Sequence, residues 1–175
     1  MPSSKSNINV HQTILVDAGI NEVWKALAED FDKIGEWSSG VNHSEGFGEP
    51  VNGSLCGERA CKINAPGFSN AKERITVYDK NSYMLSYDLY EGVPSFVKSA
   101  EITWMLMPIK EKTQMRVVSK MRATGLLGFL MRGFMRSSTK NALRSMCEEL
   151  AYYIENNKPH PKKMKAIEKF NKKKK

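Results

Sequence analysis

The sequence lacks any long apolar segment, and this absence argues against a membrane-spanning protein. No run of eighteen or more apolar residues occurs in the 175-residue chain, and a helix needs about that length to cross a bilayer. The first ten residues, MPSSKSNINV, lack the apolar core of a secretory signal. We therefore expect no transmembrane helix and a cytoplasmic location.

Disulfide, metal and phosphate motifs are also missing. The three cysteines, Cys56, Cys61 and Cys147, are an odd number without CxxC spacing, which favours free thiols in a reducing compartment. The three histidines lie far apart and lack the spacing of metal ligands. No GxxxxGKS or GxxxxGKT loop is present to cradle a phosphate. We expect neither a metal nor a cofactor.

The positive charge is concentrated at one end of the chain. Residues 158–175 hold nine lysines and one glutamate, whereas residues 1–157 hold 18 basic and 18 acidic residues. This pattern predicts one folded domain over 1–157, followed by a lysine-rich, disordered tail over 158–175. Residues 112–147 also carry eight basic residues and no acidic one. With the tail they could make weak contact with a membrane surface or a polyanion, but a solvated tail that aids solubility is the favoured explanation of the lysines.

No sequence feature supports specific recognition of nucleic acid. Basic and aromatic residues are not interleaved in the way that single-strand binding surfaces require.

The apolar periodicity changes along the chain and indicates an α+β fold. A strand is predicted over 8–16, followed by two short helices between 21 and 37. Antiparallel strands joined by short turns are predicted over 54–63, 71–80, 82–90 and 112–122, and the run from 96 to 107 shows no clean alternation. The segment 125–156 has helical period. A curved antiparallel sheet wrapped around this long C-terminal helix can leave a cavity between the two layers.

Two charged residues fall on the apolar face of consecutive predicted strands. In AKERITVYDK, Glu73 shares a face with Ala71, Ile75 and Val77, and Arg59 lies on the inward face of the preceding strand. An unpaired buried charge is costly, so we expect a salt bridge between them. With the hydroxyl of Tyr87, the pair could orient a ligand at the polar end of a cavity, or it could be a closed ion pair without any ligand.

Several segments taken in order carry a family resemblance. INEVWKALAEDFDKIGEW, GERACKI, KERITVYDKNSYMLSY, EITWMLMP and the long closing helix resemble the SRPBCC superfamily, which has the START-type helix-grip fold. The chain is most similar to bacterial polyketide cyclase/dehydrase-like members and plant abscisic-acid receptors. The resemblance implies a cavity between sheet and helix, usually for an apolar or amphipathic small molecule.

The same resemblance assigns pocket positions residue by residue. It places Glu73 at a pocket carboxylate, with Tyr87 and Leu89 lining the pocket and Phe134, Ser138 and Ala142 facing it from the helix. It places a mobile gate at the loop formed by Asn64, Ala65, Pro66, Gly67 and Phe68. This loop lacks the receptors' Ser-Gly-Leu-Pro-Ala sequence, and their ligand-holding lysine has no counterpart, so abscisic acid is not implied.

Three functional hypotheses follow from these observations. The first is a module that binds or transports a lipid-like or polyketide-like molecule, with walls from Leu85, Leu89, Met131, Phe134, Met135 and Ser138. The second is a cyclase or dehydratase in which Glu73 shuttles protons; an adjacent Arg59 would instead hold this carboxylate ionised. The third is an interaction protein that docks through its basic tail.

Overall fold

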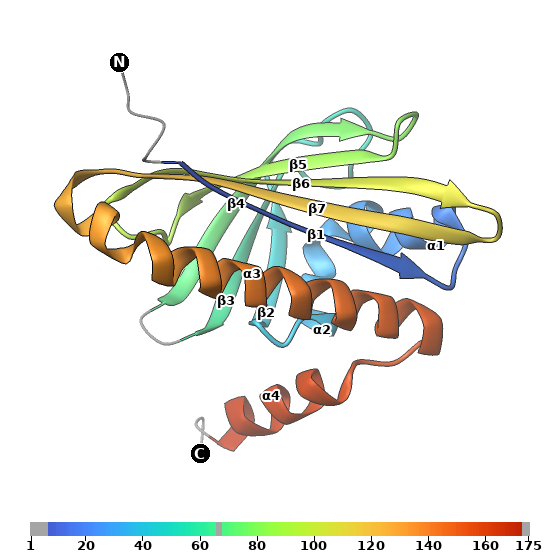
Figure 1. Cartoon of the computed structure of the whole chain (residues 1–175). Helices are drawn as coiled ribbons and strands as arrows, with labels where there is room; N and C mark the ends of the chain where they lie inside the picture. The colour runs from blue at the N-terminus through green and yellow to red at the C-terminus, as the bar shows by residue number, and fades with distance from the viewer. Residues whose placement is uncertain (1–6, 66–67, 173–175) are drawn as a thin grey trace.

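A seven-stranded antiparallel sheet forms the frame of the computed structural model, which describes residues 7–65 and 68–172 (Figure 1). The strands lie in the order β1-β7-β6-β5-β4-β3-β2, so β1 and β2 are the two edges. Their bounds are β1 Asn7–Val16, β2 Val41–Phe47, β3 Glu58–Ala65, β4 Phe68–Asp79, β5 Met84–Glu91, β6 Val97–Ile109 and β7 Lys112–Ala123.

Short helical segments connect β1 to β2 and cover one end of the sheet's concave face. They are α1 (Ile20–Trp24), a π-helical turn η2 (Lys25–Glu29), a 3-10 turn η3 (Phe31–Lys33) and α2 (Ile34–Trp37). Their apolar residues, including Trp24, Leu27 and Phe31, are buried in the main core. The core therefore fills the end of the sheet that these helices cover.

The long helix α3 (Gly125–Asn156) follows β7 and lies along β1 and β7 (Figure 1). Its second half is anchored by the buried side chains of Leu143, Cys147, Leu150 and Ala151. On the strands beneath it, alternate residues are buried, such as Met115, Val117 and Ser119 in β7. This is the period of two expected when one face of a sheet meets a helix. The predicted helix-grip fold, with a curved antiparallel sheet around a long C-terminal helix, is confirmed.

The C-terminal lysine-rich segment differs from the expectation of disorder. Residues Pro161–Lys172 form a helix, α4, which lies below α3 in Figure 1. Lys163 is 1 % exposed, and its Nζ donates a hydrogen bond to the carbonyl oxygen of Val41 at 2.6 Å. Burial lowers the pKa of Lys163, and nearby Glu149 opposes this shift. The hydrogen bond from Lys163 to Val41 ties this helix to β2, and Ala166, one turn further along α4, is buried as well.

Neither α3 nor any other helix within residues 7–65 and 68–172 combines the length and the apolar character needed to cross a membrane.

Candidate functional site

Arg59 and Glu73 meet on the concave face of the sheet. They lie directly opposite each other in the β3–β4 register, and Arg59 Nε forms a salt bridge and hydrogen bond with Glu73 Oε2. Arg59 is 3 % exposed and Glu73 is 8 % exposed. The structure thus brings together the two charges that the strand alternation places on one face.

Aromatic rings and a carbonyl enclose the Arg59 guanidinium. Its Cζ lies 3.9 Å from the centre of the Phe31 ring and 4.9 Å from that of Tyr87, and Nη1 donates to the carbonyl oxygen of Phe31 at 2.7 Å. Burial alone would lower the pKa of Arg59, but the charge of Glu73, smaller contributions from Tyr87 and Cys61 and the hydrogen bond with Glu73 together outweigh burial, so the pKa is raised. Arg59 is therefore a permanent cation whose surroundings are occupied by protein groups.

Tyr87 supplies a neutral hydroxyl beside the ion pair. Burial, followed by the charge of Glu73, raises the pKa of this phenol, so it keeps its proton at neutral pH. Trp104 Nε1 donates a hydrogen bond to Tyr87 Oη at 3.3 Å, and the Phe31 and Tyr87 rings meet edge to face at 5.4 Å. The residues of this cluster come from five elements: Arg59 from β3, Glu73 from β4, Tyr87 from β5, Trp104 from β6 and Phe31 from η3.

One carboxylate oxygen of Glu73 remains available. Within residues 7–65 and 68–172, Oε1 accepts no hydrogen bond, and the side chain keeps 11 % of its surface exposed. An ionised carboxylate oxygen only accepts hydrogen bonds. The site can therefore accept a hydrogen bond from a hydroxyl or amine group at Oε1, while Arg59 engages the other carboxylate oxygen.

Half-buried apolar side chains continue the concave face away from the ion pair. They pack against the main core without being fully covered, and they include Ile63, Leu89, Phe96, Ile102 and Met121. Leu85, which is predicted to line the cavity wall, is fully buried opposite Trp104. Ile102 was missed because the run from 96 to 107 shows no alternation, although it lies opposite Tyr87 in the β5–β6 register.

The helix residues predicted to face the pocket differ in how far the structure buries them. Met131 and Met135 are half-buried, whereas Phe134, Ser138 and Ala142 are exposed. At about 100° per residue, Ser138 and Ala142 share a flank of α3 with Glu149. Glu149 accepts hydrogen bonds from the backbone N of Ser39 at 2.5 Å and from its hydroxyl at 2.7 Å. This flank therefore faces the β2 edge, and nothing in the described chain covers Ser138 and Ala142 there.

The predicted gate residues lie at the β3–β4 connection. Asn64 is held by its backbone N, which donates to Gly40 O at 2.8 Å, and by its side chain, which donates to Ser39 O at 3.1 Å. Ala65 pairs with Phe68 in the strand register. Pro66 and Gly67 lie outside the described residues, so the role of the loop stays a prediction.

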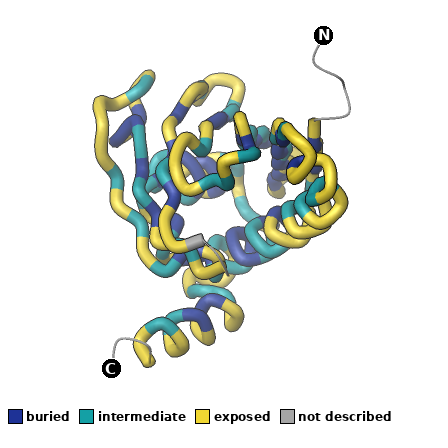
Figure 2. Tube along the Cα trace, turned by 90° about the vertical axis from the view of Figure 1, so that its left-hand side faces the viewer, coloured by how far each residue is buried: buried dark blue, intermediate teal, exposed yellow. Residues whose placement is uncertain are grey.

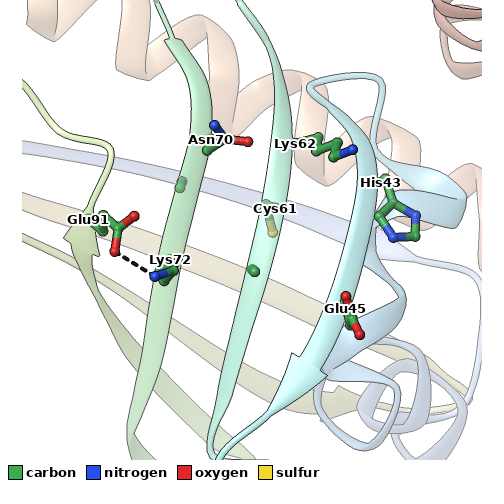
Figure 3. A pocket seen from close by; sticks show the side chains of 9 residues that line it. His43, Glu45, Cys61, Lys62, Asn70, Lys72 and Glu91 are labelled. Atoms are coloured by element: carbon green, nitrogen blue, oxygen red, sulfur yellow. Dashed lines mark ion pairs between the residues drawn. The ribbon is translucent and has the colours of Figure 1, made fainter.

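A separate groove lies on the outer face of β2, β3 and β4 (Figure 3). It has a volume of about 200 Å³ and is lined by charged and polar side chains of both signs, among them His43, Glu45, Lys62, Lys72 and Glu91. Lys72 and Glu91 form an ion pair at 2.8 Å. No three His, Cys, Asp or Glu side chains in the described part of the chain gather as metal ligands. The groove is too small and polar for a lipid-sized apolar ligand.

Comparisons with solved structures agree with the helix-grip fold. The Thermus thermophilus protein TTHA0849 is 16 % identical with a TM-score of 0.65, over 83 % of this chain and 96 % of that chain. Norcoclaurine synthase from Thalictrum, solved as a point mutant with a transition-state analogue, is 14 % identical with a TM-score of 0.65, over 86 % and 96 %. Ara h 8.0201 is 12 % identical with a TM-score of 0.61, over 85 % and 97 %.

The seven-stranded antiparallel sheet and the long C-terminal helix define a helix-grip fold. Residues 7–155 match the family described as polyketide cyclase / dehydrase and lipid transport, and the chain belongs to that family. No curated protein matches the chain.

Proposed function

We propose that this protein binds or carries an apolar or amphipathic small molecule between the concave face of the sheet and α3. The observation that carries the proposal is the set of half-buried apolar side chains that both layers present, Leu89, Ile102 and Met121 from the sheet and Met135 from α3. Protein interiors are normally close-packed, so apolar side chains left partly uncovered beside a polar cluster suit a ligand. The family description, which includes lipid transport, supports the same reading.

The polar end of the site favours one kind of ligand. Glu73 Oε1 faces a ligand as an acceptor, and Arg59 is already shared between Glu73 and Phe31. A hydroxyl or amine would donate to this oxygen, whereas a second carboxylate would be repelled by it. We therefore propose a ligand with an apolar body and a hydrogen-bond donor at one end, held by Glu73 with Tyr87 beside it.

Native mass spectrometry of the purified protein, followed by organic extraction, tests this proposal. A co-purifying apolar molecule released on denaturation is expected. Dodecanol added to the emptied protein should bind at least about tenfold more tightly than dodecanoate, because the dodecanoate carboxylate meets Glu73. Equal binding of the two, or tighter dodecanoate binding, would refute the assigned polar end.

A blocking variant separates the interior site from nonspecific surface binding. Ala142→Trp adds bulk on the flank of α3 that faces the β2 edge, and the exposed alanine can be enlarged without disturbing the core. Asn141→Trp is the matched control, because Asn141 is also exposed but lies about 100° further around the helix. Dodecanol binding should fall in Ala142→Trp alone; an equal fall in both variants, or in neither, contradicts the proposed location.

A further inference from the structure

The first turns of α3 expose a cluster of large apolar side chains. Leu126, Leu127, Phe129, Leu130 and Phe134, which we call the α3 apolar face, are between 54 % and 76 % exposed. Nine consecutive residues thus contain five of the thirteen exposed large hydrophobic residues in the described chain. Figure 2 shows exposed positions along this part of the helix and buried ones in its second half. Such concentration on the surface of a folded domain marks an interaction surface.

The α3 apolar face does not line the proposed ligand site. Gly128 is the buried residue of these turns, and a Cβ built on it would lie 3.1 Å from the Cβ of Ala123, at the end of β7. Gly128 therefore marks the side of α3 that faces the sheet. At about 100° per residue, Leu126 and Leu130 lie about 160° from Gly128, on the opposite side of the helix. These two side chains point away from the interior.

Only positive charge accompanies this apolar face along the helix. Arg132, Arg136, Lys140 and Arg144 follow at intervals of four residues, and no acidic residue occurs between 112 and 147. Within residues 7–65 and 68–172, none of these four side chains forms an ion pair. Their charge is available to an anionic partner.

We infer that the first turns of α3 dock on an anionic membrane surface, a function that goes beyond ligand binding in the interior and does not depend on it. The apolar face would enter the boundary between head groups and acyl chains, and the exposed side chains of Arg136, Lys140 and Arg144 would contact anionic head groups, as in interfacial amphipathic helices. A second copy of the chain fits less well, because it would bring like charges together without an acidic partner. The α3 apolar face lies at one end of the molecule (Figure 1). Just before it, Thr124 N donates to Phe96 O at 2.8 Å and ties the start of α3 to the segment that precedes β6.

Vesicle flotation with the full chain tests this inference. The protein is mixed with vesicles of phosphatidylcholine alone or of phosphatidylcholine with phosphatidylserine, at low and high salt. Binding is expected only with phosphatidylserine and should weaken as salt rises. Leu126→Ser/Leu130→Ser should weaken binding by at least about tenfold, because two apolar side chains are removed from the contact.

Leu55→Ser/Met107→Ser is the matched control, because these residues are 71 % and 57 % exposed but lie outside α3. It should bind like the wild type, and circular dichroism should show both double variants folded. Wild-type binding by Leu126→Ser/Leu130→Ser would overturn the inference and point to the lysines of α4. Absence of binding to either vesicle overturns it as well. A wild-type dimer that this variant converts to a monomer, measured by light scattering, would assign the face to a second copy instead.

Discussion

Removing one charge from the Arg59–Glu73 pair should destabilise the fold far more than removing one from the surface. Glu73→Gln leaves the Arg59 guanidinium, which is 3 % exposed, with neutral partners only. Breaking a buried ion pair in this way costs about 3–5 kcal/mol. Because a glutamine oxygen can still accept from Arg59, we expect a loss of about 3 kcal/mol, and a similar loss for Arg59→Met, which leaves the Glu73 charge and the Phe31 carbonyl unpaired.

Urea unfolding of the two single variants and of Arg59→Met/Glu73→Gln measures the coupling between these residues. The double variant removes both charges, so it should lose at least about 2 kcal/mol less than the sum of the single losses. Glu91→Gln is the control, because the Lys72–Glu91 pair is exposed to solvent, and it should unfold like the wild type. Additive losses, or a Glu73→Gln variant as stable as the wild type, would refute the buried and mutually dependent pair.

Two further predictions concern backbone geometry and pH. Gly92→Ala should lower the free energy of unfolding by about 2 kcal/mol or more, because Gly92 has φ +87° and a Cβ there would lie 2.0 Å from Asn70 O. Gly125→Ala should lower it by only about 1 kcal/mol, because Gly125 has φ +75° but open space around the new Cβ. Equal losses of the two variants in urea unfolding would contradict this. Burial raises the pKa of Cys61 and Cys147 from 9.0 to about 12. The folded protein thus holds protons that the unfolded chain releases, so stability is complete below pH 9 and falls between about pH 9 and 12. Cys147→Ala should lessen this fall, and an unchanged slope would show that its thiol does not titrate as described.

The strand residues of the candidate site could be predicted because a strand has a strict period of two. Glu73 shares its face with Ala71 and Ile75, which are buried, whereas a register shift after Ile75 leaves Val77, predicted on the same face, exposed. The short connection between β3 and β4 makes Arg59 a neighbour of Glu73. The period does not reveal which backbone groups lie above the sheet. The carbonyl of Phe31 accepts a hydrogen bond from Arg59 across 28 residues of sequence. The strand pattern alone therefore could not predict this contact.

The buried face of α3 was harder to predict, because a helix shows which residues share a side but not what covers them. The family resemblance predicts that Ser138 and Ala142 face the pocket, and the structure leaves both exposed. The second half of the helix is anchored by Leu143 and Leu150, whereas Gly128 is the buried residue in its first turns. Apolar residues such as Leu130 on the outer side of these turns look, in the sequence, like core residues.

The order of the C-terminal segment also depends on a contact that is distant in the sequence. Composition predicts disorder for residues 158–175, because lysine is rarely buried without a partner. The partner of Lys163 is the carbonyl oxygen of Val41, which is 122 positions away in the chain. A pairing of that separation cannot be read from local composition.

The most direct test of the proposed function is an NMR titration with dodecanol of protein carrying ¹³C-labelled methionine methyl groups. Met121 of β7 and Met131 and Met135 of α3 lie on the two layers that enclose the proposed site, whereas Met107 and Met164 are exposed elsewhere. We predict saturable shifts at Met121, Met131 and Met135, with Met107 and Met164 unchanged. Shifts confined to Met107 and Met164, or no saturable shift at any methionine, would contradict ligand binding between the sheet and α3.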